Sequence, residues 1–212
     1  MLFIKNNQKG ATMLETLGVL TIISMLGIGT IKLVGNVMAM FKQSLVVNEV
    51  RDIQQAISGR YSFEGNYSEL FKDTTEYGNS VEDQIIIANL LCSEKMIPNQ
   101  LCGGGMLRHR MGGDIWILNT DDENKFMRYA LQFEGLTDKA CLNLAQINWH
   151  NKKKSNIYSI SIFNYNTLKL KVVLPDSRED YTDVIKPFPI SLDYITNACK
   201  GDDNNVIQWE FY

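Results

Sequence analysis

Prolines are scarce in this sequence, and their scarcity leaves room for one long helix near the N-terminus. Only 4 of the 212 residues are proline, and the first of them is Pro98. A proline inside a helix removes a backbone donor and clashes with the preceding turn. The absence of any proline before residue 98 therefore permits an uninterrupted helix over a large part of this stretch.

Motifs for catalysis and metal binding are also missing. The 2 histidines stand at no zinc-ligand spacing to the cysteines, and the sequence has no Cys-x-x-Cys pair. His109 lies between Arg108 and Arg110 with no nucleophile in a recognisable motif, which predicts an exposed basic patch. The glycines at 103–105 precede no strand-to-helix phosphate loop. We therefore expect no catalytic residue, no cofactor and no metal.

The charged residues indicate neither a nucleic-acid partner nor a calcium site. The net charge is -3 at pH 7, whereas domains that bind nucleic acid are usually basic. Two acidic clusters, Asp121–Glu123 and Asp202–Asp203, do not fit the aspartate-rich calcium loop with its central glycine. We interpret both clusters as solvated turns.

A long apolar run follows a short basic stretch at the N-terminus. Lys5 and Lys9 lie in the first ten residues, and the only charge from Ala11 to Ile31 is Glu15. About 20 apolar residues suffice to cross a bilayer core of ~30 Å. A secretory signal peptide has the same order of segments, but this run is long for one and no small-x-small cleavage site follows it. The sequence predicts a membrane-spanning helix.

The helical pattern continues past the apolar run. Val46, Val50, Ile53 and Ile57 recur at spacings of four, three and four, with polar residues between them, which is typical of an amphipathic helix. We predict one helix from about Ala11 to about Ser58. Its first half suits lipid or other helices, and its second half needs a globular body to cover one apolar stripe.

The remaining residues predict an α+β body. Tyr61–Ser80 is expected to be a loop, Val81–Lys95 a short helix, and Leu136–Ile147 a second amphipathic helix with Thr137 as its N-cap. Asn164–Thr167 supplies the turn of a hairpin. Five strands are predicted from short or alternating apolar runs: Ile115–Leu118, Met127–Phe133, Ile157–Phe163, Leu168–Leu174 and Val206–Phe211.

Four cysteines lie behind the apolar segment: Cys92, Cys102, Cys141 and Cys199. An even number of cysteines in a chain with an export signal favours disulfides. Reduced, buried thiols are the alternative.

The segment Gly10-Ala-Thr-Met-Leu-Glu15 in front of the apolar run resembles the processing site of type IV prepilins and pseudopilins. In that family a membrane peptidase cuts after the glycine and methylates the new amine. The resemblance implies a cut between Gly10 and Ala11, with Glu15 as the fifth mature residue that guides assembly. A buried carboxylate needs a counter-charge, and the terminal amine of a neighbouring subunit would supply it. Ala11 departs from the Phe, Met or Leu of many members.

Two C-terminal segments resemble type IVb pilins, which include the bundle-forming and thin conjugative pilins. These segments are the passage Tyr129–Ala145, and the tail from Ile195 through the final strand. The resemblance implies a Cys141–Cys199 bridge, which would contribute roughly 4 kcal/mol in the chain-entropy model. Cys92 and Cys102 are then left to pair with each other. The resemblance does not extend to residues 62–125.

The resemblance implies four segments along the chain. Residues 1–10 are the leader, 11–35 the transmembrane and assembly half of the long helix, 36–60 its amphipathic half, and 61–212 the globular pilin domain.

The resemblance also implies a function, which we take as an expectation. The chain would be a major or minor subunit of a bacterial type IVb pilus for adhesion, aggregation or conjugation, and not an enzyme. Its partners would be other pilins, a prepilin peptidase and the inner-membrane assembly machinery. The precursor would sit in the inner membrane with its C-terminal domain in the periplasm, and the mature form in an extracellular pilus. The alternatives are a pseudopilin of a type II secretion system and a signal-anchored periplasmic binding module.

Overall fold

The computed structural model describes residues 8–61, 66–75, 78–120, 127–147, 149, 156–164, 167–173, 190–200 and 204–212. The chain forms two units, Met1–Lys42 and Gln43–Tyr212. The helices are α1 (Gln8–Tyr61), α2 (Ser68–Phe71), α3 (Val81–Ser93), the short 3-10 helix η2 (Asn99–Leu101), α4 (Asp138–Ala145) and α5 (Leu192–Ala198). The strands are β1 (Cys102–Gly103), β2 (Met106–Arg108), β3 (Asp114–Asn119), β4 (Tyr129–Leu136), β5 (Ile157–Asn164), β6 (Thr167–Val173) and β7 (Asn205–Phe211).

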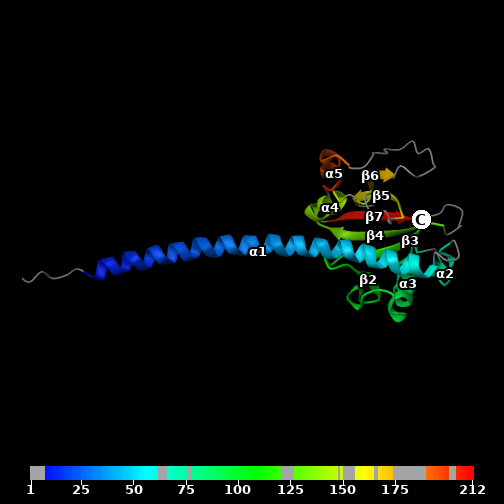
Figure 1. The fold of residues 1–212 in the computed structure, drawn as a ribbon, viewed down its shortest axis with the longest axis horizontal. Coiled ribbons are helices and arrows are strands. Elements are labelled where there is room, and N and C mark those ends of the chain that lie inside the picture. The colour runs from blue at the N-terminus through cyan, green and yellow to red at the C-terminus, as the bar shows by residue number, and fades with distance from the viewer. Residues whose placement is uncertain are drawn as a thin grey trace, which may run out of the picture. The chain divides into compact units, whose positions relative to one another are not determined.

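Helix α1 is one uninterrupted helix of 54 residues (Figure 1). It extends the predicted helix by three residues at each end. Gly59 does not end it, because an exposed glycine costs a helix only ~1 kcal/mol and Tyr61, two residues later, is buried in the core. Over the part of the chain that the structure describes, no helix combines the length and the apolar character needed to cross a membrane.

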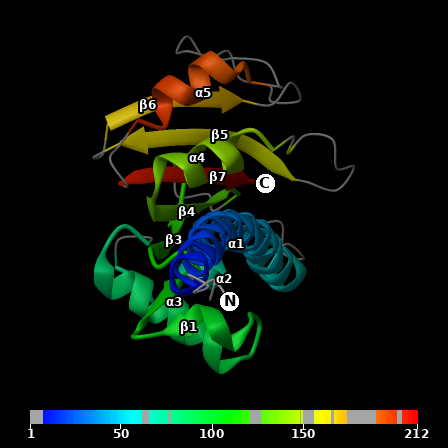
Figure 2. The ribbon, with the colours of Figure 1, turned by 90° about the vertical axis from the view of Figure 1, so that its left-hand side faces the viewer.

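The strands form one seven-stranded sheet in the order β1-β2-β3-β4-β7-β5-β6. Every pairing is antiparallel. The last strand of the chain, β7, therefore lies in the interior of the sheet between β4 and β5 (Figures 1 and 2). This arrangement confirms the predicted α+β class and all five predicted strands. The predicted hairpin is the β5–β6 pair, which closes at Asn164 and Thr167.

Sequence reasoning missed several short elements. Strands β1 and β2 are only 2 and 3 residues long, and Gly104 and Gly105 turn the chain between them with φ of 75° and 93°. The sequence predicted neither strand, because no apolar alternation fits in so few residues. Tyr61–Ser80 was expected to be a loop, but it contains α2, whose Leu70 and Phe71 are buried.

The helix-facing side of the sheet is apolar. Ile117 pairs with Leu131, Leu131 with Trp209, and Trp209 with Ile160, so a buried row crosses four strands. The predicted stripe of α1 packs into the same core: Val46, Val50, Ile53 and Ile57. Helix α4 lies on this side as well (Figure 2). The predicted N-cap is confirmed, because the Thr137 hydroxyl accepts a hydrogen bond from Ala140 N at 3.2 Å. The helix begins at Asp138 rather than at Leu136, which is the last residue of β4.

The buried side chain of Gln84 joins helix α3 to strand β3 of the sheet. The Gln84 amide donates to the Ile117 carbonyl at 2.8 Å and accepts from Ile117 N at 2.9 Å. Strand β2 pairs with β3 only at Asp114 and Ile115, so the backbone of Ile117 is open on that edge. Gln84 replaces the missing strand there and satisfies both groups.

Candidate assembly site

The residues named for processing and assembly lie in the first turns of α1. Gly10, Ala11 and Glu15 are all helical. The Glu15 side chain is exposed, and within the described residues it makes no hydrogen bond or ion pair. Their roles in cleavage, methylation and assembly stay predictions.

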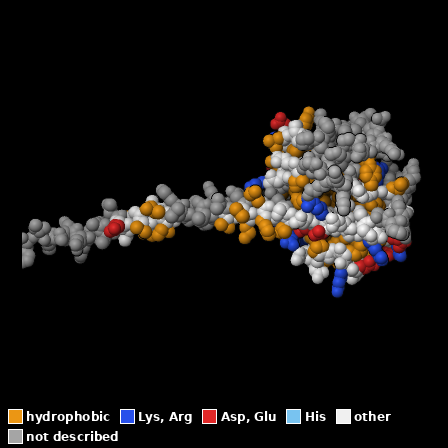
Figure 3. Space-filling model, in the orientation of Figure 1, with side chains coloured by type: hydrophobic (Ala, Val, Ile, Leu, Met, Phe, Trp, Pro, Cys, Tyr) orange, Lys and Arg blue, Asp and Glu red, His pale blue; other side chains and the backbone are white. Residues whose placement is uncertain are grey.

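The helix around Glu15 exposes an unusual amount of apolar surface. Ten large apolar side chains between residues 17 and 41 are 52–66 % exposed: Leu17, Val19, Leu20, Ile22, Ile23, Val34, Val37, Met38, Met40 and Phe41. Figure 3 shows this apolar surface on the described stretches of the helix. Large exposed apolar patches on a protein mark a protein or membrane contact.

The polar side chains near Glu15 are satisfied within the helix. The hydroxyl of Thr21 donates to the Leu17 carbonyl, and that of Ser24 donates to the Leu20 carbonyl, each at 2.7 Å. Because neither hydroxyl needs water, this stretch can be covered by apolar surroundings at little cost.

An ion pair between a buried glutamate and a partly exposed arginine fixes the amphipathic half of α1 to the body. Glu49 is 4 % exposed, and its Oε1 lies 3.1 Å from Arg110 Nε. The backbone N of Arg110 donates to Oε2 at 3.3 Å. Burial raises the pKa of Glu49, and the neighbouring Arg110 opposes that rise. The pair was missed in the sequence, although Glu49 stands three residues after Val46 and so falls on the predicted buried stripe.

His109 corrects a prediction, because it is not part of an exposed basic patch. It is 2 % exposed and stacks on Phe133 with ring centroids 5.2 Å apart. Met111 N donates to Nδ1 at 3.3 Å, so Nε2 carries the proton and donates to the Glu134 carbonyl at 2.8 Å. Burial lowers the pKa of His109. Gly113 permits this approach, since a Cβ there would lie 1.8 Å from the Glu134 oxygen.

Two disulfides join elements of the body. Cys141 of α4 is bonded to Cys199 after α5, with 5.6 Å between their Cα atoms. Cys92 of α3 is bonded to Cys102 of β1, with 6.0 Å between their Cα atoms. The Cys141–Cys199 bond is the one that the resemblance to type IVb pilins implies. The Cys92–Cys102 bond joins the two cysteines that remain.

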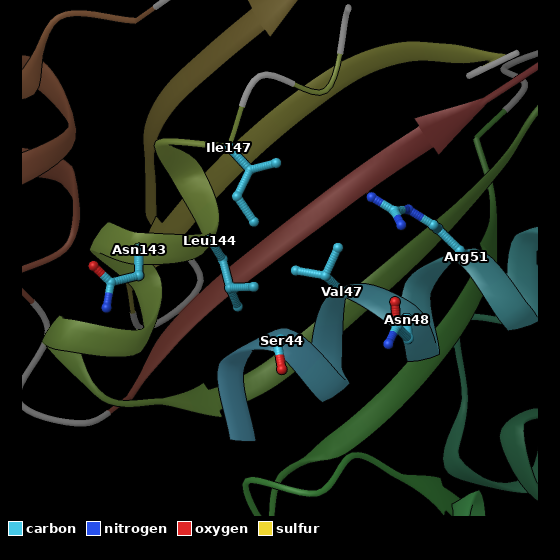
Figure 4. A pocket seen from close by; sticks show the side chains of 7 residues that line it. All are labelled: Ser44, Val47, Asn48, Arg51, Asn143, Leu144 and Ile147. Carbon is cyan, nitrogen blue, oxygen red and sulfur yellow. The ribbon is translucent and has the colours of Figure 1, made fainter. Parts of the chain in front are cut away.

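A groove of about 400 Å³ runs between α1 and α4 (Figure 4). Helix α1 contributes Ser44, Val47, Asn48 and Arg51, and α4 with its following turn contributes Asn143, Leu144 and Ile147. The floor is apolar and the rim is polar. Nothing in the sequence singled out this groove, because its two walls are separated by about ninety residues.

No metal site stands out in the described part of the chain, where no three His, Cys, Asp or Glu side chains are grouped to hold an ion. Asp121–Glu123 and Asp202–Asp203 lie outside the described residues.

Comparison with known proteins identifies the fold. No protein-family model matches the sequence, and no curated protein matches it. The crystal structure of TcpA, a type IV pilin from Vibrio cholerae El Tor biotype, superposes with a TM-score of 0.54 over 81% of this chain and 99% of that chain, at 14% identity. The chain has the type IV pilin fold. The crystal structure of the type IV b pilin from Salmonella typhi matches at 12% identity over 74% of this chain and 97% of that chain, with a TM-score of 0.39, too low to add support.

Within this type IV pilin fold, several elements come from the stretch that the sequence resemblance does not reach. Helix α3, η2 and strands β1 and β2 all belong to the stretch 62–125. They extend the sheet beyond β3, and the Cys92–Cys102 disulfide holds them together. Gly10 and Glu15 belong to the first unit, and all four cysteines belong to the second.

Proposed function

We propose that the protein is a structural subunit, major or minor, of a type IVb pilus, and that it assembles through its N-terminal helix rather than acting as an enzyme. The observation that carries the proposal is the exposed apolar surface of α1 between residues 17 and 41, on a chain with the type IV pilin fold. A monomer in water would not keep such a surface uncovered. Packing of the same helix from many copies covers it.

The proposed pathway begins with a membrane-held precursor. Lys5 and Lys9 keep the leader on the cytoplasmic side by the positive-inside bias, residues 11–35 lie in the inner membrane, and the body folds in the periplasm, where both disulfides can form. Prepilin peptidase cuts after Gly10 and methylates the amine of Ala11. The assembly machinery then extracts the subunit, and the mature form is part of an extracellular filament that serves adhesion, aggregation or conjugation.

Glu15 has a physical role in this pathway. A carboxylate among apolar helices is expensive unless a positive charge meets it. The amine that cleavage creates at Ala11 of a neighbouring subunit meets this need. Neutralising the pair fixes the axial register between subunits.

Shearing tests the proposal. The chain is produced in a cell with a type IVb assembly system, and surface filaments are sheared and probed for the protein. We expect the protein in the filaments, and its loss from them with Glu15→Ala while the protein level in the membrane is unchanged. A protein that stays in the membrane, while a control pilin reaches the filaments, would instead support a signal-anchored binding module. Short filaments seen only with a type II secretion system would support a pseudopilin.

A further inference from the structure

The groove between α1 and α4 combines apolar side chains with polar ones and a single arginine. Val47 and Leu144, both buried, form its floor together with the partly buried Ile147. Figure 4 shows the Val47 and Arg51 side chains extending from α1 toward the side where Leu144 and Ile147 lie. Its volume of about 400 Å³ is roughly that of a dozen waters at about 30 Å³ each, which is room for several side chains.

Arg51 is the unusual residue of this groove. The other arginines that the structure describes all have a carboxylate partner: Glu94 for Arg60, Asp114 for Arg108, Glu49 for Arg110, and Glu210 for Arg128. Arg51 is partly buried, yet it has no hydrogen bond or ion pair with any residue in that part of the chain. A half-desolvated guanidinium without a partner is unfavourable, so the groove lacks an acid.

The N-terminal helix of a second copy carries the matching surface. Glu15 is the only acidic residue before Glu49, and it too has no partner among the described residues. Gly18, Val19 and Ile22 follow it at helical spacings of three, four and seven, so they share its face. Val19 and Ile22 are exposed, and a Cβ at Gly18 would meet nothing within 4 Å, which allows close approach of another helix.

We propose that, in the filament, the face formed by Glu15, Gly18, Val19 and Ile22 of one subunit docks into the α1–α4 groove of another, where the Glu15 carboxylate binds Arg51. The inference rests on the proposed function. Glu15 and Arg51 of one chain belong to the same uninterrupted helix, in which only residues three or four apart are neighbours. The contact therefore forms between copies. A carboxylate has two oxygens, so Glu15 can accept from Arg51 and from the Ala11 amine together.

Cross-linking tests the position of the contact. The photo-reactive amino acid p-benzoylphenylalanine replaces Asn48, an exposed residue of the groove rim, and sheared filaments are irradiated and digested. We expect cross-linked peptides that contain Glu15. The same probe at Asn89, exposed on α3, is the matched control and should not capture that peptide. Capture of any other segment at Asn48, or no capture in intact filaments, would overturn the inference.

Charge reversal tests the ion pair. Arg51→Glu places a carboxylate opposite Glu15, and we expect filament yield to fall at least tenfold, whereas Arg51→Lys should keep most of it. Arg60→Glu is the matched control on the same helix, because Arg60 is exposed and its partner Glu94 lies 3.9 Å away. Unchanged thermal melting of the purified variants shows that their fold is intact.

The outcomes separate this inference from the proposed function. If the unmodified protein never enters filaments while a control pilin does, the proposed function fails. If it enters filaments and Arg51→Glu enters them equally well, the function stands and the groove contact is wrong.

Discussion

His109 is held in its neutral form by the groups around it. Its Nδ1 accepts from Met111 N, and its Nε2 donates to the Glu134 carbonyl. A protonated ring has no lone pair for Met111 N, and burial disfavours its charge. The turn that carries His109 also carries Arg110, the partner of Glu49 on α1. The state of this one ring therefore bears on how α1 is fastened to the body.

The lowered pKa of His109 predicts a pH dependence of stability. The unfolded chain binds a proton near pH 6.5, while the folded chain resists it until a lower pH. The contribution of the neutral His109 ring to the free energy of unfolding is therefore complete above pH 6.5. It is lost as the pH falls from 6.5 toward the pKa of His109 in the folded state. We expect His109→Gln to lose less stability than the unmodified protein between pH 7.5 and pH 5, measured by urea unfolding. Parallel curves for the two proteins would contradict this account.

The raised pKa of Glu49 acts with the opposite sign. The folded chain binds a proton at a higher pH than the unfolded chain does, so this group favours the folded state as the pH falls through the window above about 4.5. The His109→Gln comparison isolates the histidine, because Glu49 is present in both proteins.

Gly113 is the glycine for which the fold has least tolerance. A Cβ there would lie 1.8 Å from the Glu134 oxygen and 2.5 Å from the His109 ring nitrogen. We expect Gly113→Ala to lower the free energy of unfolding by about 2–4 kcal/mol, as strained substitutions do. Gly59→Ala is the control, since nothing lies within 4 Å of its Cβ and alanine in an exposed helix is favoured by ~0.5–1 kcal/mol. Equal urea midpoints for the two variants would exclude this account of Gly113.

At the scale of elements, the apolar periodicity of the sequence was enough to predict the long helices and strands, but not the short ones. The stripe from Val46 to Ile57 and the alternation in Val206–Phe211 each cover more than one period, and both elements are present. Strands β1 and β2, and helix α2 with 4 residues, are shorter than a period can reveal. Their positions depend on tertiary contacts, such as the burial of Leu70 and Phe71 of α2 and the bond from Cys102 of β1 to Cys92 of α3.

The two disulfides should contribute unequally to stability. Cys141 and Cys199 are separated by 58 residues, and Cys92 and Cys102 by 10. In the chain-entropy model these loops correspond to roughly 4 and roughly 3 kcal/mol. We expect the double alanine variant at Cys141 and Cys199 to lose more stability in urea than the double alanine variant at Cys92 and Cys102. A larger loss of stability in the variant without the Cys92–Cys102 disulfide would contradict this. It would mean that this disulfide stabilises the α3–β1 region by more than the chain-entropy effect.

At the scale of the whole molecule, the sequence predicted residues of the N-terminal helix in the candidate site. It did not predict the groove between α1 and α4. Gly10 and Glu15 were named from a resemblance that six consecutive residues carry. Arg51 was not named, because a missing partner is visible only once every neighbour is placed. The groove needs α1 and α4 side by side, which no local pattern specifies.

The central claim is that the chain is a processed filament subunit, and the mass of its N-terminus tests it most directly. The full chain is made with and without a matching prepilin peptidase, and its intact mass and first peptide are measured. The account predicts a new N-terminus at methylated Ala11 that disappears in Gly10→Val. An intact Met1, from a peptidase that cuts a control prepilin, or a cut beyond Lys32 would contradict it.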